Sequence, residues 1–116
     1  MKPLPTEFRS DGYCFQLLRR AGTVALLAKR KTPRSCPNFE VVIIQTRPAE
    51  QIFGNRLPAR EMMPPSESWG VLGWSDSNFP AAETRFNRLC RALRKGRIPF
   101  QGFAVAPSRL ARHISL

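Results

Sequence analysis

The sequence predicts an α+β domain in which a small, mostly antiparallel sheet carries one amphipathic helix packed on one face. Three observations support this prediction. Two apolar-rich runs around Gly22 are spaced like a hairpin, a third run is apolar on consecutive positions, and a later segment has apolar residues at helical spacing. With 116 residues, 42% of them hydrophobic, the chain is long enough for one core and too short for two domains.

The hairpin is predicted from residues 13–20 and 23–31, which are joined by Ala21-Gly22. Glycine supplies the positive φ angle that a tight turn needs. Both strands end in basic residues, so we expect those ends to lie in water. The preceding residues 1–12 are expected to form a flexible leader.

A central strand is predicted over residues 39–47, because the run 41–44 is apolar on both faces of an extended chain. Residues 48–67 follow, with four prolines and no sustained hydrophobic period. A connection of that length in so small a domain is either functional or partly structured, for instance as a helical turn around residues 49–53.

The next predicted strand, residues 68–76, contains both tryptophans of the chain and is interrupted by Gly70 and Gly73. Trp69 and Trp74 are five residues apart, which puts them on opposite faces of a regular strand unless a bulge intervenes. We expect Trp69 to belong to the core. For Trp74 two roles stay open, a second core residue or an exposed contact for a protein partner.

A helix is predicted over residues 79–95, with Ser77 or Asn78 as its cap and Gly96 as its stop. Its apolar face is spaced by four, three, one and three residues, as one side of an α-helix requires. That face comprises Ala82, Phe86, Leu89, Cys90 and Leu93.

The domain is therefore expected to span residues 13–106, with a last edge strand at 102–106 and a disordered tail at 107–116.

Positive charge is the strongest bulk feature of the sequence, with 19 Lys and Arg against 8 Asp and Glu, a net charge of +11. Residues 1–40 carry +5, residues 41–84 carry −2, and residues 85–116 carry +8 without any acidic residue. The field therefore arises from the two flanks of the sequence. A field of this sign attracts polyanions such as nucleic acid.

The cations that flank the apolar runs form two clusters. Five lie on the predicted helix, outside its apolar face: Arg85, Arg88, Arg91, Arg94 and Lys95. The hairpin end supplies Lys29, Arg30 and Lys31, followed by Arg34. Such residues contact phosphate and position nucleic acid without reading its sequence. Alternatively, they form a solvated face that serves solubility, and a groove between the clusters requires that the hairpin end lies beside the helix.

Catalytic and metal-binding patterns are absent from the sequence, which favours a binding protein that is not an enzyme and needs no cofactor or metal. The one histidine, His113, is close to the last residue of the sequence. The cysteines Cys14, Cys36 and Cys90 are odd in number and widely spaced, as in a reduced, cytoplasmic protein. No apolar run approaches the ~20 residues of a membrane span, so no membrane partner is expected.

The middle of the chain, residues 39–86, resembles small uncharacterised proteins of bacterial phages, plasmids and integrated mobile elements. The resemblance is carried by the two-faced strand, by an Ala-Arg-Glu step in the proline-rich loop, by Ser-Glu-x-Trp-Gly-x-x-Gly-Trp over residues 66–74, and by the helix that follows. It implies a mobile-element setting and carries over no catalytic residue.

Binding of nucleic acid or of a nucleoprotein complex is the leading hypothesis, and two alternatives remain. One is a protein–protein binder that inhibits a host defence complex, in the manner of anti-CRISPR proteins, through the long loop and Trp74. The other is a structural or assembly component of a mobile element.

Overall fold

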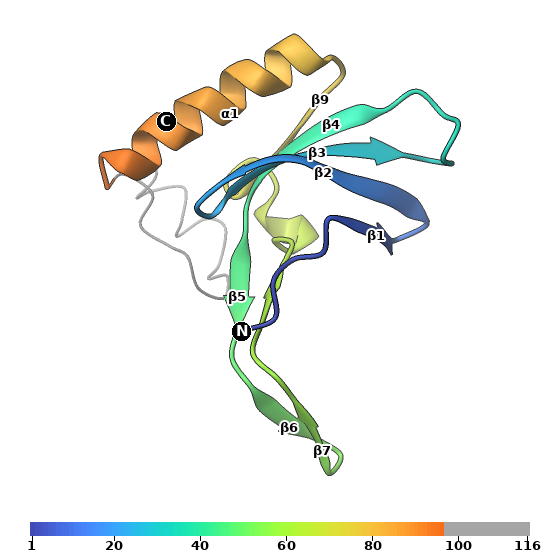
Figure 1. Ribbon diagram of the computed structural model, residues 1–116, viewed down its shortest axis with the longest axis vertical. Coiled ribbons are helices and arrows are strands. Elements are labelled where there is room, and N and C mark those ends of the chain that lie inside the picture. Colours follow the sequence, from blue (N-terminus) through green and yellow to red (C-terminus); the bar gives the residue numbers. More distant parts are fainter. Residues whose placement is uncertain (97–116) are drawn as a thin grey trace.

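A five-stranded antiparallel sheet, covered on one face by a helix, forms the body of the molecule in the computed structural model, which describes residues 1–96. The strand order is β1-β2-β3-β4-β9, where the strands are β1 (Glu7–Ser10), β2 (Tyr13–Ala21), β3 (Val24–Arg30), β4 (Asn38–Ile43) and β9 (Gly73–Asp76). Helix α1 (Phe79–Arg94) packs on β3, β4 and β9 (Figure 1). The predicted α+β class is confirmed.

Strands β3 and β4 supply two cores, one on each face of the sheet. Alternate residues point towards α1 and form the helix-side core with the apolar face of the helix; from the two strands these are Val24, Leu26, Val41 and Ile43. The residues between them form the opposite-face core with Leu4 and Phe15; these are Ala25, Leu27, Val42 and, just past β4, Ile44. All eight are fully buried, which confirms the prediction of a strand apolar on both faces.

Helix α1 begins and ends where its local sequence indicates. The Asn78 side chain accepts a hydrogen bond from the backbone N–H of Ala81 at 2.9 Å, so the structure uses Asn78 rather than Ser77 as the cap. Gly96, with φ +69°, follows the last turn. The predicted apolar face is buried except for the half-buried Leu93.

The segment expected as a flexible leader contributes β1, which pairs with β2 at the edge of the sheet. Before it, the backbone of Lys2 bonds with Ala59 (3.0 Å) and Glu61 (2.8 Å), and Leu4 is buried. The strand has only four residues, of sequence Glu-Phe-Arg-Ser, so its apolar pattern is too short to be recognised.

The long connection after β4 forms a two-stranded arm, residues 45–62, that extends away from the sheet (Figure 1). At the base of the arm, β5 (Gln45–Arg47) pairs with β8 (Arg60–Met62). At its tip, β6 (Glu50–Ile52) pairs with β7 (Asn55–Leu57). The helical turn expected around residues 49–53 is therefore wrong. Phe53 and Gly54 have φ angles of +49° and +78°, and they reverse the chain in a tight hairpin instead.

The strand predicted over residues 68–76 begins only at Gly73. Before it, Ser66–Ser68 form a 3-10 turn, and the carbonyl of Ser68 accepts hydrogen bonds from Val71 and Leu72. The chain thus turns between the two tryptophans instead of running straight.

The expected strand at residues 102–106, the tail at 107–116 and His113 lie outside the described residues. Within residues 1–96, no helix has the length and apolar character needed to cross a membrane.

Candidate functional site

The solvent side of α1 carries four exposed cations, which we call the outer-helix cations: Arg88, Arg91, Arg94 and Lys95. Spacings of three and four residues place Arg88, Arg91 and Lys95 on one side of the helix. None of the four forms an ion pair with another residue of the range 1–96. Their charge is therefore available to an external anion.

Arg85, the fifth predicted helix cation, has internal partners instead. Its Nε donates to Asp76 Oδ2 at 3.1 Å, and its guanidinium lies 5.6 Å from the centroid of the Trp74 ring. Asp76 ends β9, so this pair ties the helix to the edge strand and compensates the charge of Arg85.

The predicted hairpin cations also divide into paired and free residues. Lys29 points away from α1, lies 3.6 Å from Glu40 Oε2, and has its ammonium 4.3 Å from the centroid of the Tyr13 ring. Arg30 donates to the side chain of Gln16 at 3.3 Å. Lys31 is exposed in the loop after β3.

The hairpin end and the outer-helix cations do not line a common groove. The ring centroids of Phe39 and Phe79 are 5.6 Å apart. Because Phe39 lies at the start of β4 and Phe79 begins α1, the β3–β4 loop lies near the first turn of the helix. Gly22, at the other end of the hairpin, faces Leu93 in the last turn. In Figure 1 the orange end of α1 and the β3–β4 loop accordingly lie on opposite sides of the view.

The two tryptophans lie on opposite faces of the sheet, although the regular strand from which their spacing predicted this is interrupted by the turn before Gly73. Trp74 is half-buried against the helix-side core and beneath Arg85. Trp69 is half-buried against the opposite-face core, although it precedes β9 and reaches that face through the turn before Gly73. Part of Trp74 is thus committed to packing, and only its remaining surface is open to a partner.

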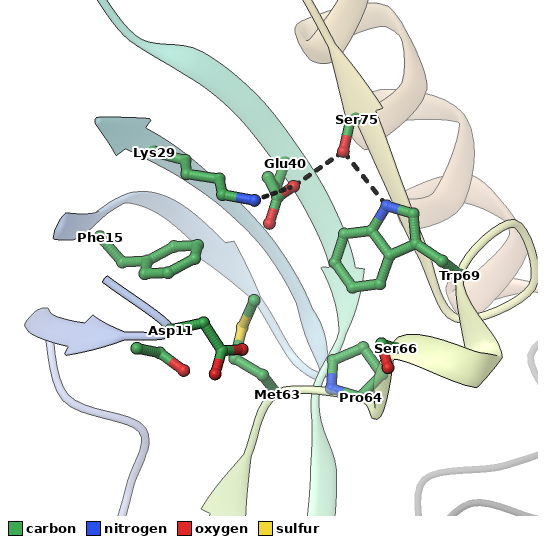
Figure 2. A pocket seen from close by; sticks show the side chains of 10 residues that line it. Asp11, Phe15, Lys29, Glu40, Met63, Pro64, Ser66, Trp69 and Ser75 are labelled. Atoms are coloured by element: carbon green, nitrogen blue, oxygen red, sulfur yellow. Dashed lines mark hydrogen bonds and ion pairs between the residues drawn. The ribbon is translucent and has the colours of Figure 1, made fainter. Parts of the chain in front are cut away.

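A cavity of about 320 Å³ opens on the face of the sheet opposite α1, and we call it the sheet cavity (Figure 2). Its lining comes from the end of β1 and the turn after it, from strands β2, β3, β4 and β9, and from the segment that leads into Trp69. The lining residues are Ser10, Asp11, Phe15, Lys29, Glu40, Met63, Pro64, Ser66, Trp69 and Ser75.

A chain of polar contacts crosses this cavity from Lys29 to Trp69 (Figure 2). The Glu40 side chain is only 4% exposed, and its Oε2 accepts a hydrogen bond from Ser75 Oγ at 2.7 Å and pairs with the Lys29 ammonium. Ser75 Oγ in turn accepts from Trp69 Nε1–H at 3.1 Å. These partners offset the cost of burying a carboxylate and hold the indole ring at the cavity wall.

Gly73 allows the Trp69 ring to take this place. A Cβ atom at residue 73 would lie 2.5 Å from Cζ3 of the ring, closer than two non-bonded carbon atoms approach in proteins. The glycine predicted to interrupt a strand therefore serves a close side-chain contact.

The chemistry available in the sheet cavity is stacking and hydrogen bonding. Trp69 presents a half-buried ring and Asp11 an exposed carboxylate, whereas Phe15 and Glu40 line the cavity as buried residues and the Lys29 ammonium is paired with Glu40. Among residues 1–96, no group of three His, Cys, Asp or Glu is arranged to hold a metal ion.

Sequence reasoning did not select Asp11, Glu40 or Ser75. The available signal was Glu40, a charged residue inside a run that is apolar on both faces, since such an acid needs a buried partner. The sequence predicts that its partner, Lys29, contacts phosphate, because the pairing of β3 with β4 cannot be recognised from the local sequence.

Comparisons with protein-family models, with curated proteins and with solved structures found no match to this chain.

Proposed function

We propose that this protein binds nucleic acid through phosphate contacts of the outer-helix cations. The observation that carries the proposal is the exposure of Arg88, Arg91, Arg94 and Lys95 on α1, without ion-pair partners in the range 1–96. Like charges at these spacings repel one another by a few tenths of a kcal/mol per pair. A polyanion relieves that repulsion and releases its condensed counterions on binding.

The cations with internal partners have a smaller part in this proposal. Lys29 is paired with Glu40 and Arg85 with Asp76, so phosphate would have to compete with a carboxylate at each. Lys31 is exposed and forms a separate, weaker contact region at the hairpin end.

The proposal assigns a non-enzymatic binding role in the cytoplasm, on nucleic acid or a nucleoprotein complex. The resemblance of residues 39–86 to proteins of phages and plasmids supports a mobile-element setting. Since phosphate contacts carry no base information, this surface alone would bind without sequence preference.

A salt series tests the proposal directly. We expect labelled DNA and RNA oligonucleotides to bind at low salt, with an affinity that falls as salt rises. The variant Arg88→Glu/Arg91→Glu should bind more weakly. Lys31→Glu/Arg34→Glu changes the net charge equally at another exposed place, and it should have the smaller effect.

Two outcomes contradict the proposal. One is the absence of any complex at low salt. The other is an equal loss of affinity in both double variants, which would trace binding to net charge rather than to α1.

A second candidate function, binding to a host protein, is favoured by one observation at the tip of the arm. The Phe53 side chain is 99% exposed beside the partly exposed Ile52. Aromatic residues of this kind act as anchors in protein interfaces. Under this function, the protein purified from lysate keeps its protein partner after nuclease treatment. The variant Phe53→Asn should lose that partner, whereas Arg88→Glu/Arg91→Glu should keep it.

A further inference from the structure

We propose that the sheet cavity binds one unstacked nucleobase, so that the nucleic acid engaged by this protein is single-stranded at that point. The inference rests on the proposed function and adds a second, base-reading surface to it. Single-stranded nucleic acid is commonly held by aromatic side chains on which successive bases stack.

The dimensions and opening of the cavity suit a small ligand. Its volume of about 320 Å³ lies at the lower end of the range for ligand sites, roughly 300 to 1,000 Å³. Its rim includes the exposed residues Ser10, Asp11, Ser66 and Ser75, so the cavity is reached from solvent.

The stacking surface of the cavity is the half-buried Trp69 ring, because Phe15 is only 7% exposed and the Lys29 ammonium lies 5.8 Å from the centroid of its ring. Phe15 and Trp69 line opposite sides of it in Figure 2. Phe15 is held from behind by Phe8, with parallel rings whose centroids are 5.0 Å apart. Trp69 is held by its hydrogen bond to Ser75 and by its contact with Gly73. The two rings are therefore positioned before any ligand arrives.

The charges of the cavity favour a neutral heterocycle over an ion. A phosphate group would meet the carboxylates of Glu40 and Asp11. A ligand cation would compete with Lys29, whose ammonium already lies over the Tyr13 ring and pairs with Glu40. A nucleobase fits because its edge carries N–H donors for the carboxylates and acceptors for the ammonium.

These groups also indicate which bases are preferred. Carboxylates accept hydrogen bonds from exocyclic amino groups, which adenine, cytosine and guanine carry and thymine and uracil lack. We expect cytosine- and adenine-containing strands to bind more tightly than thymine-containing ones.

Tryptophan fluorescence measures occupation of the cavity. In Trp74→Phe, Trp69 is the remaining tryptophan of the chain, and it lies at the cavity wall. Addition of oligo-dC or oligo-dA should quench its emission, oligo-dT should quench less, and a DNA duplex should not quench. Free cytidine should compete with oligo-dC, but only at much higher concentration.

Asp11→Asn is the test variant, because Asp11 is exposed and asparagine tolerates its φ angle of +52°. It should lower the preference for dC over dT by about three- to ten-fold, because the neutral amide accepts a hydrogen bond from the cytosine amino group more weakly than a carboxylate does and can also donate to thymine O4. Glu67→Gln, an exposed acid outside the cavity lining, is the matched control and should leave the preference unchanged.

The outcomes separate this inference from the proposed function. Salt-sensitive oligonucleotide binding with constant Trp69 emission, and with equal affinity for dC and dT, overturns the base site and leaves the phosphate contacts standing. Quenching by free cytidine but by no oligonucleotide assigns the cavity to a free nucleoside and overturns the single-strand inference. Failure of every oligonucleotide to bind overturns both.

Discussion

Glu61 is the residue that joins three distant parts of the chain. Its carboxylate accepts hydrogen bonds from both terminal nitrogens of Arg20 in β2, one of them at 2.7 Å, and from the backbone N–H of Leu4 at 2.9 Å. The Arg20 hydrogen bonds are the main reason why the pKa of Glu61 falls from 4.5 to about 2. Because Glu61 lies in β8, this cluster fixes the base of the arm to the sheet.

The first prediction concerns Glu61→Gln. Since the pKa of the carboxyl group is lower in the folded state, its stabilising effect is complete above pH ~5 and is lost as pH falls towards ~2. We expect the variant to have a free energy of unfolding lower by roughly 1 to 2 kcal/mol at neutral pH. Urea denaturation across pH 7 to 3 should show this difference shrinking; a constant difference would contradict the prediction.

The second prediction concerns Gly73, where the obstacle to substitution is a side-chain contact. Gly73→Ala places a methyl group within 2.5 Å of the Trp69 ring, so the indole must move and lose its bond to Ser75. In a Trp74→Phe background, the Trp69 emission should shift to longer wavelength. Ser75→Ala removes the bond without crowding the ring and should give the smaller shift.

At the scale of elements, the sequence predicts the strands, turns and helix that are marked by a local residue pattern. Glycine marks the β2–β3 turn, β4 reads as buried because its apolar residues are consecutive, and α1 combines a helical period with a cap. The arm lacks such signals. A two-residue hairpin turn usually carries Asn-Gly or Asp-Gly, whereas this one carries Phe53-Gly54, and a bulky residue with positive φ is rare.

The third prediction follows from the φ angle of Phe53. This angle is costly for a bulky side chain, and the ring gains no burial in return because it is 99% exposed. Phe53→Asn should therefore stabilise the tip of the arm by about 1 kcal/mol, which is roughly a five-fold slower amide exchange in β6 and β7. Arg56→Asn, exposed with an ordinary φ angle, is the control; equal exchange in both variants would contradict the argument.

At the scale of the whole molecule, the sheet separates two surfaces with different chemistry. The outer-helix cations lie beyond one face, and the sheet cavity opens on the other. The period of the helix is enough to predict which of its residues face solvent, but it cannot predict that Arg85 and Lys29 are paired. Their partners, Asp76 and Glu40, come from other elements of the fold.

The fourth prediction is that the two surfaces contribute independently to binding of single-stranded DNA. If the outer-helix cations contact phosphate as proposed, Arg88→Glu/Arg91→Glu removes two such contacts, and the slope of log affinity against log salt should become shallower by about 1.4 for a single strand. The preference for dC over dT should not change. Asp11→Asn should do the reverse, lowering the preference without altering the slope.

Because the two sites share no contacts and lie on opposite faces of the sheet, the effects of these substitutions on binding free energy should add in the combined variant to within about 0.5 kcal/mol. Fluorescence anisotropy with labelled oligo-dC and oligo-dT over a salt series measures both quantities in one experiment. A change in base preference on charge reversal in α1 would show that the two surfaces are energetically coupled, and their independence would then be wrong.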